Sequence, residues 1–159
     1  ITCTHPPRVY ISLRPSRYSH EIISKTGEFV INLVPSSMVR AADSCGVYTG
    51  RKVDKFKRFS LTAEPSHKVG APSIAQSPMS LECKVYSVLP QGTHDMFLAD
   101  VVAVGVEESL LDEKGGLHLD RARLAAYSHG EYFRLGEMIG HFGWSVRKKK
   151  KRHPSRSGK

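Results

Sequence analysis

The pattern of apolar and polar residues predicts two long strands in the second half of the chain. They cover residues 80–89 and 95–108 and flank the turn PQGTH at 90–94, a pattern typical of an antiparallel hairpin. In the first strand Leu81, Cys83 and Val85 share one face. The second strand is apolar on both faces, which favours a central strand that is covered on both sides.

The remaining elements are shorter. β-branched and aromatic residues predict strands at 8–13 and 28–34, and helical patterns occupy 16–27, 36–46 and 51–59. For the first helix, Ser16 suits the N-cap and Gly27 suits the position just past the end. Tyr18, Ile22 and Thr26 form one stripe along it.

Strands therefore dominate, and two or three short helices lie in the connections. Residues 60–78, rich in Pro, Ser and Gly, show little periodicity. We find neither alternating βαβ units nor a GxGxxG loop after a strand, which argues against a Rossmann domain. The pattern predicts a mainly β protein, a small antiparallel barrel in a chain whose 159 residues suit one domain.

The charge is unevenly placed along the chain. Its net value is +9, yet the tail from 147 to 159 holds eight Lys and Arg and no acidic residue, which leaves +1 for residues 1–146. We expect the tail to be a disordered, solvated end; contact with RNA, DNA or acidic lipid is the alternative. The nearly neutral body has no basic stripe interleaved with aromatics and so argues against nucleic-acid binding.

Cysteine and histidine spacing limits the chemistry further. Three cysteines without CxxC spacing predict reduced thiols and a cytoplasmic protein, and eight scattered histidines without HExxH spacing predict no metal site. No apolar run approaches the roughly 20 residues that cross a bilayer, so we expect no membrane partner.

The stretch SLRPSRYSHEII, residues 12–23, is the strongest candidate for a binding site. It gathers Arg14, Arg17, Ser16 and Ser19 where a strand passes into a helix, and helix starts already favour anions. Guanidinium groups suit phosphate because they donate paired hydrogen bonds. The alternative is a surface turn with solvated arginines.

Four blocks in this order resemble the flavin reductase family. They are PPRVYISLRPSRYSHEIISKTGEFVINL, CGVYTGRKVDKF, QGTHDMFLADVVAV and AYSHGEYFRLG, and the second is similar to the flavoredoxin-like branch. The resemblance implies a split β-barrel, a Greek-key antiparallel barrel that binds FMN. It assigns residues 1–146 to that domain, without the family's N-terminal strand, and 147–159 to the tail.

The resemblance also implies which residues hold the cofactor. Arg14, Arg17 and Ser19 would donate to the ribityl phosphate, and Ser12 and Leu13 would lie near the ring or the ribityl chain. The remaining expected contacts are Pro15, Tyr18, Asn32, Thr2 and Cys3. A bond from Asn32 to a neighbouring loop, and a merely buried Cys3, are the alternatives.

Two histidines are the candidates for a catalytic role. By its place in the family motif, His94 would seat the nicotinamide; the alternative is a turn histidine. His129, with Tyr132, would line the cofactor or the dimer seam, or be structural. In the block GRKVDKF the charges of Arg51, Asp54 and Lys55 fit a solvated helix face equally well.

The resemblance implies an oxidoreductase and a homodimer. Hydride would pass from NADH or NADPH to FMN, and electrons would then go to free flavin, ferric iron, oxygen or an acceptor protein. One alternative is a non-enzymatic FMN-binding electron carrier of the flavoredoxin type. Another is a module that binds nucleic acid or an acidic surface through its basic tail.

Overall fold

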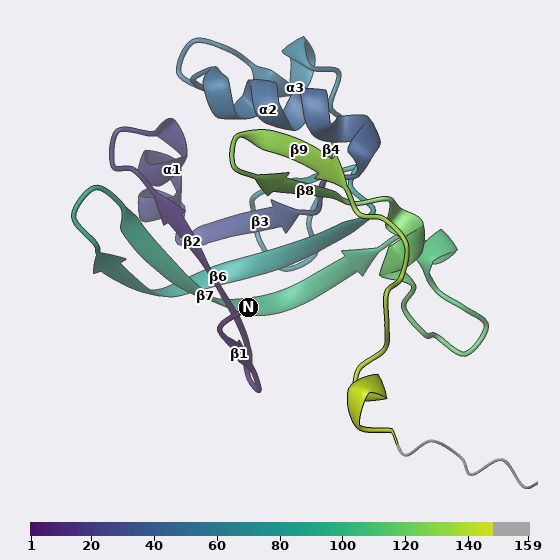
Figure 1. The fold of residues 1–159 in the computed structure, drawn as a ribbon. Coiled ribbons are helices and arrows are strands. Elements are labelled where there is room, and N and C mark those ends of the chain that lie inside the picture. The colour runs from purple at the N-terminus through teal and green to yellow at the C-terminus, as the bar shows by residue number, and fades with distance from the viewer. Residues whose placement is uncertain (148–159) are drawn as a thin grey trace, which may run out of the picture.

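The computed structural model describes residues 1–147 and is built around one antiparallel sheet (Figure 1). Its strands follow the order β1 (Cys3–Thr4), β2 (Pro7–Leu13), β7 (Asp95–Val106), β6 (Met79–Pro90) and β3 (Glu28–Asn32). The predicted hairpin is confirmed as β6 and β7, which pair over most of their length. Register shifts between Glu82 and Cys83 and between Val85 and Ser87 bend it.

Short helices and two small ribbons fill the connections. The helices are α1 (Tyr18–Thr26), α2 (Val39–Val47) and α3 (Lys55–Arg58), with 3-10 turns η1 (Ser36–Met38), η2 (Glu108–Leu110), η3 (Leu119–Ala122) and η4 (Trp144–Val146). The ribbons pair β4 (Ala63–Glu64) with β5 (Ser73–Ile74), and β8 (Ala125–Ser128) with β9 (Glu131–Arg134). The mainly β architecture with short helices is thus confirmed. Among the described strands the main sheet stays open, because its edge strands β1 and β3 do not pair with each other.

The core lies between α1 and the sheet. Ile23 of α1 packs with Val9, Phe29, Phe97 and Cys83 on one face of it. The stripe expected through Ile22 is therefore wrong by one residue, since Ile22 is 43% exposed. Burial raises the pKa of the Cys83 thiol to about 11, as expected for a cysteine that only packs.

Acidic and amide side chains hold the long connection between α3 and β6. The buried carboxylate of Glu82 accepts hydrogen bonds from the amides of His67 and Lys68, at 2.9 and 2.6 Å. The amide of Ile74 donates to Asn32 Oδ1 at 3.0 Å. Asn32 thus makes the loop contact that was the alternative to a cofactor contact.

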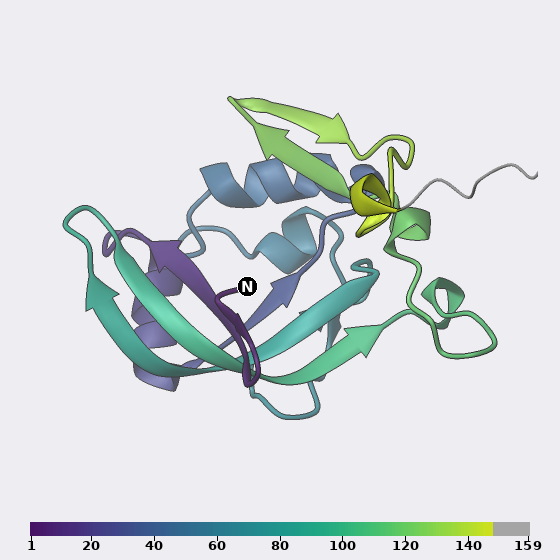
Figure 2. The same ribbon diagram turned by 60° about the horizontal axis from the view of Figure 1, so that its bottom comes forward.

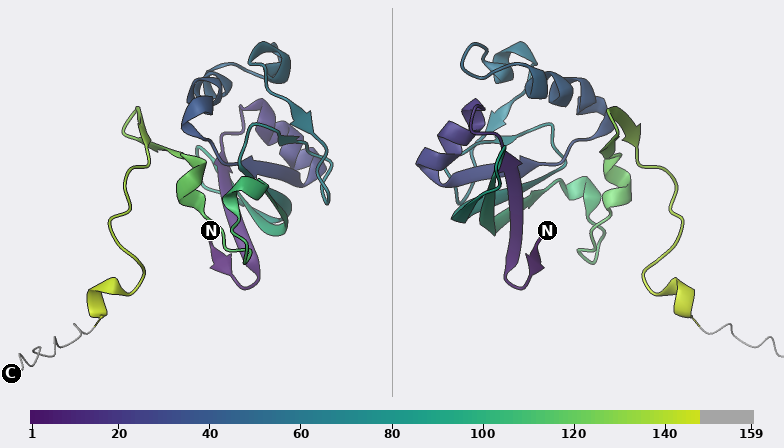
Figure 3. Two further views of the ribbon diagram at one scale, coloured as in Figure 1. Left: turned by 90° about the vertical axis from the view of Figure 1, so that its right-hand side faces the viewer. Right: turned by 60° about the vertical axis from the view of Figure 1, so that its left-hand side comes forward.

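Three ribbon views show how the helices and the long hairpin are arranged. The turn of the β6–β7 hairpin comes up beside the start of α1 (Figure 2), while α2 and α3 lie together above β3 (Figure 1). The segment after β9 runs away from the body of the molecule (Figure 3). No helix within residues 1–147 has the length and apolar character to span a membrane.

Candidate functional site

The loop from β2 into α1 presents free backbone donors. Helix α1 begins at Tyr18, and Arg17 rather than Ser16 is its N-cap, because the Arg17 amide already bonds Arg14 O at 2.9 Å in a tight turn. No side chain caps this helix. The amides of Tyr18 and Ser19 are therefore available to an anion, whereas the His20 amide already donates to Arg17 O at 3.1 Å. The expectation of a serine cap was wrong.

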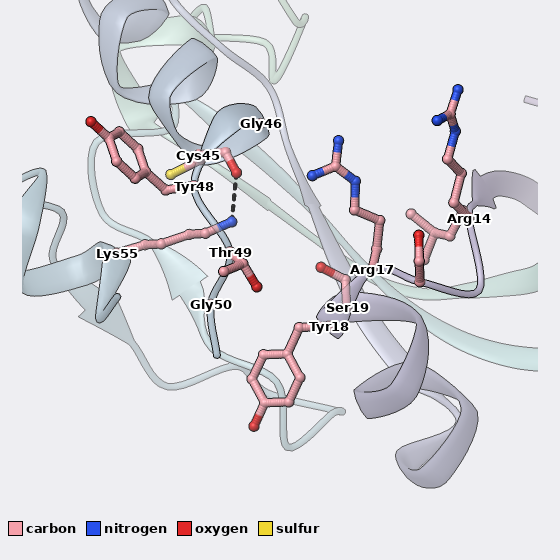
Figure 4. Close-up of a pocket in the computed structure, with 12 residues that line it drawn as sticks. Arg14, Arg17, Tyr18, Ser19, Cys45, Gly46, Tyr48, Thr49, Gly50 and Lys55 are labelled. Atoms are coloured by element: carbon pink, nitrogen blue, oxygen red, sulfur yellow. Dashed lines mark hydrogen bonds between the residues drawn. The ribbon is translucent and has the colours of Figure 1, made fainter. Parts of the chain in front are cut away.

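A cavity of about 400 Å³ opens between this loop and the segment from the end of α2 to the start of α3. Its lining combines three cations, five hydroxyls and two glycines with apolar contacts: Leu13, Arg14, Ser16, Arg17, Tyr18, Ser19, Cys45, Gly46, Tyr48, Thr49, Gly50 and Lys55. Figure 4 shows the side chains of Arg14 and Arg17 extending in the same direction from the loop. Among the described residues no carboxylate lines this cavity, so its charge favours an anionic group.

The far wall of the cavity is held in place by contacts with α1. Arg51 stacks over the Tyr18 ring at 4.8 Å and pairs with Glu21 at 2.6 Å. Hydrogen bonds from Lys25 and Arg51 lower the pKa of Glu21. A Cβ on Gly50 would lie 3.0 Å from Tyr18 Cδ1, so the close approach of this wall favours glycine.

Lys55 joins α3 to the end of α2. Its ammonium donates to the carbonyl of Cys45, at the C-terminal end of α2 where helix carbonyls are otherwise unpaired (Figure 4). Asp54 caps α3 by accepting from the Lys57 amide at 3.1 Å. Burial raises the pKa of the Cys45 thiol, although nearby Lys55 opposes this, so the thiol form is favoured in the cavity wall.

A second cavity of about 300 Å³ adjoins the first, with Arg14 and Arg17 in the lining of both. Ser12, Leu13 and His94 complete it. Arg14 Nε donates to His94 Nε2 at 3.4 Å, and His94 Nδ1 lies 2.9 Å from the Thr93 hydroxyl. Since Arg14 can only donate, His94 Nε2 is the acceptor in this hydrogen bond.

Asp95 has a role that its place at a strand start did not reveal. Its carboxylate lies 2.7 Å from His20 Nε2, and both side chains are largely buried. The His20 ring also packs edge-on against Phe97 at 5.2 Å. This pair fixes the start of α1 against the strand that follows His94.

The other candidate residues lie elsewhere. Within the described part of the chain, neither cavity is lined by Pro15, Asn32, Thr2, Cys3 or His129. Thr2 and Cys3 lie at the edge strand β1, and His129 occupies the exposed β8–β9 turn with a φ of +55°.

The β8–β9 hairpin is nevertheless tied to α2. Tyr132 donates its hydroxyl to Asp43 at 3.1 Å, and desolvation together with this bond raises the pKa of Tyr132. Within residues 1–147 this contact belongs to neither cavity.

Sequence reasoning missed the cavity wall supplied by Cys45, Tyr48 and Thr49, and it treated Lys55 as equally well explained by a solvated helix face. The available signal was the block CGVYTGRKVDKF, which carries two glycines, two hydroxyls and two lysines within a few residues. The basic tail beyond residue 147 lies outside the described residues.

Comparison with known proteins gives consistent matches. The model of the flavin reductase like domain matches residues 1–136. A Pyrococcus abyssi protein is 32% identical over 84% of this chain and 76% of its own length. A relative from Archaeoglobus fulgidus, 30% identical, is covered over only 62% of its length.

Two solved structures and one reductase component extend the comparison. Flavoredoxin of Desulfovibrio vulgaris is 29% identical with a TM-score of 0.86, covering 92% of this chain and 80% of that one. Flavoredoxin from Methanosarcina acetivorans is 26% identical with a TM-score of 0.82 and the same coverage. The reductase component of a Rhodococcus opacus 4-nitrophenol monooxygenase is 29% identical over 63% of this chain and half of its own length.

Proposed function

Because this chain belongs to the flavin reductase like domain family, we propose that it binds FMN and reduces it with NADH or NADPH. One observation carries the proposal. A cavity with cations, hydroxyls and free helix-start amides but, within residues 1–147, no lining carboxylate adjoins a smaller cavity that contains His94. Such a pair suits a ligand with an anionic end and a flat aromatic end.

The lining residues fit the phosphate end of FMN. Arg14 and Arg17 would donate to the phosphate oxygens, with Ser19 and Thr49 adding hydroxyl donors. The Lys55 ammonium already donates a hydrogen bond to the Cys45 carbonyl. It would therefore contribute mainly its positive charge to the phosphate site. The uncapped first turn of α1 would supply backbone donors.

FMN, when bound, supplies a redox-active ring that accepts a hydride from the nicotinamide and passes electrons to a second acceptor. The chain's own residues bind and orient. We propose that His94, which lies beside Arg14, seats the nicotinamide against the ring. Free flavin, ferric iron, oxygen or a protein would then take the electrons.

The direct test mixes purified protein with FMN and either NADH or NADPH and follows the loss of the reduced nicotinamide. Steady oxidation supports a reductase. The flavoredoxins among the structural relatives favour a second candidate, an electron carrier. A carrier would bind FMN yet oxidise no nicotinamide unless a partner reductase is added.

We further propose that the working form is a homodimer. The C-terminal arm, residues 135–147, exposes large apolar side chains and runs away from the body (Figure 3): Leu135, Met138, Ile139, Phe142, Trp144 and Val146. Ile139 is 93% exposed and Phe142 is fully exposed. Six such side chains bury on the order of 800 Å², which is about what each partner contributes to a standard interface.

Sedimentation analysis tests the dimer. The wild type should sediment with the mass of two chains, whereas the double variant Ile139→Asp, Phe142→Asp should sediment as one chain. A monomeric wild type, or a variant that remains dimeric, would contradict this assignment.

The three free cysteines support a reducing, cytoplasmic setting.

A further inference from the structure

A third cavity, of about 500 Å³, lies against α2 and next to the proposed phosphate site. One wall is the α2 side, with Ser37, Arg40 and Ser44, and the other is the end of α3, with Arg58 and Ser60. Tyr48 lines this cavity and the 400 Å³ cavity as well. The two cavities are therefore neighbours that share one side chain.

The cavity offers guanidinium groups that the protein itself leaves unused. Within residues 1–147 neither Arg40 nor Arg58 forms an ion pair. Arg58 instead stacks over the Tyr48 ring at 4.5 Å, and Phe59 packs against the same ring with centroids 5.9 Å apart. A stacked guanidinium beside aromatic rings presents both a planar surface and hydrogen-bond donors.

The net charge of residues 14–58, which supply most of the lining of both cavities, also favours an anionic ligand. Residues 14–58 contain nine Lys and Arg against four Asp and Glu, a net charge of +5. The rest of residues 1–146 contains seven against eleven, a net charge of −4. Five of the nine cations in residues 14–58 line the two cavities, which is more positive charge than a single phosphate group requires: Arg14, Arg17, Lys55, Arg40 and Arg58.

We propose that this third cavity binds an adenylate group, the adenosine phosphate half of a dinucleotide. The inference rests on the proposed function, because it takes the neighbouring cavity as the site of the flavin phosphate. Arg40 and Arg58 would hold the second phosphate, the planar stack would meet the adenine, and serine hydroxyls would meet the ribose. The adenylate comes either from FAD, where it is joined directly to the flavin phosphate, or from NADH or NADPH.

Two single variants of the full chain test the proposal, Arg40→Ala and Arg58→Ala. Both arginines are exposed, so neither change opens a core cavity, and thermal melting of each variant checks the fold. Lys57→Ala is the matched control, since it removes an exposed charge from the same helix but does not line the cavity. FMN, FAD and AMP are titrated separately, and KM for NADH and NADPH is measured on FMN-loaded protein.

If the adenylate belongs to FAD, each arginine variant should lose roughly tenfold or more in FAD affinity while FMN affinity stays within about twofold. If it belongs to the nicotinamide cofactor, KM for NADH or NADPH should rise instead. In either case AMP binding should weaken, and Lys57→Ala should change none of these values.

Unchanged AMP binding in both variants would overturn the inference, as would equal losses in FMN and FAD affinity or an equal effect of Lys57→Ala. The AMP titration needs no flavin. A wild type that binds AMP but not FMN would therefore contradict the proposed function and leave this cavity as an adenylate site.

Discussion

Replacing Arg17 by alanine removes the guanidinium that lines both cavities beside the start of α1. No carboxylate within residues 1–147 pairs with Arg17, so the change leaves no buried partner unsatisfied. A charge-assisted hydrogen bond contributes about 1.5–3 kcal/mol. Because Arg17 is exposed and partly screened by solvent, we expect the lower end, about a tenfold weaker affinity for FMN.

The assay is a titration of each flavin by the quenching of its fluorescence, on the wild type and on Arg17→Ala. Riboflavin provides the internal control, since it carries the same ring without the phosphate. Its affinity should be the same for both proteins, and added salt should weaken only FMN binding. Arg121→Ala, which removes an arginine from the separate cavity near η3, should behave as the wild type.

Equal losses for FMN and riboflavin would refute the reasoning, because they would show that Arg17 acts on the ring or on the fold. An unchanged FMN affinity would refute it as well.

Three further predictions concern stability and the cavity wall. Burial opposes the charged form of Glu82, but the amide hydrogen bonds outweigh it and lower the pKa, so the stability that this carboxylate contributes is present above about pH 4.5 and is lost as the pH falls through the lowered value. Glu82→Gln should cost about 2 kcal/mol in urea unfolding at neutral pH and should weaken the loss of stability on acidification. A variant whose stability falls with acid as steeply as that of the wild type would contradict this prediction. Asp95→Ala breaks the pair with His20 and should cost about 1–2 kcal/mol, lowering Tm by about 2–8 °C, whereas an unchanged melting curve would mean that the pair contributes nothing. Alkylation of Cys45, followed by peptide mass spectrometry, should be slow at neutral pH because its pKa is raised, should accelerate with pH, and should be slowed further by FMN; no protection by FMN would place the ligand elsewhere.

The end of α1 could be predicted from the sequence, whereas its start could not. Gly27 adopts the left-handed conformation with a φ of 68° and its amide bonds Ile23 O, as its residue type indicated. At the other end, the Arg14–Arg17 turn moved the helix start two residues beyond Ser16. The residue type at a helix start indicates which side chain can accept a hydrogen bond from the first amides, but it does not indicate how the preceding loop turns.

The β2–α1 side of the site was predictable for a similar reason. Arg14, Arg17 and Ser19 are close in the chain, and a strand-to-helix loop brings them together locally. The opposite wall, Thr49 and Lys55, reaches the cavity only through tertiary contacts such as the Arg51 stack on Tyr18. Loop contacts of this kind have no periodicity that a sequence pattern could reveal.

Long-range partners of polar side chains were equally hidden. Asn32 follows three apolar residues on β3, and the sequence allowed both a cofactor and a loop as its partner. The hydrogen bond from the Ile74 amide shows that the loop is its partner. Asp95 begins β7, and only the fold places His20 beside it. In both cases the partner is decided by how distant segments pack.

A crystal structure of the protein with FMN tests the central claim most directly. The account predicts the phosphate within hydrogen-bonding distance of Arg17, Ser19 and the first amides of α1, with the ring toward His94. A phosphate found in bulk solvent or in another cavity, with Arg14 and Arg17 turned away from it, would contradict the account.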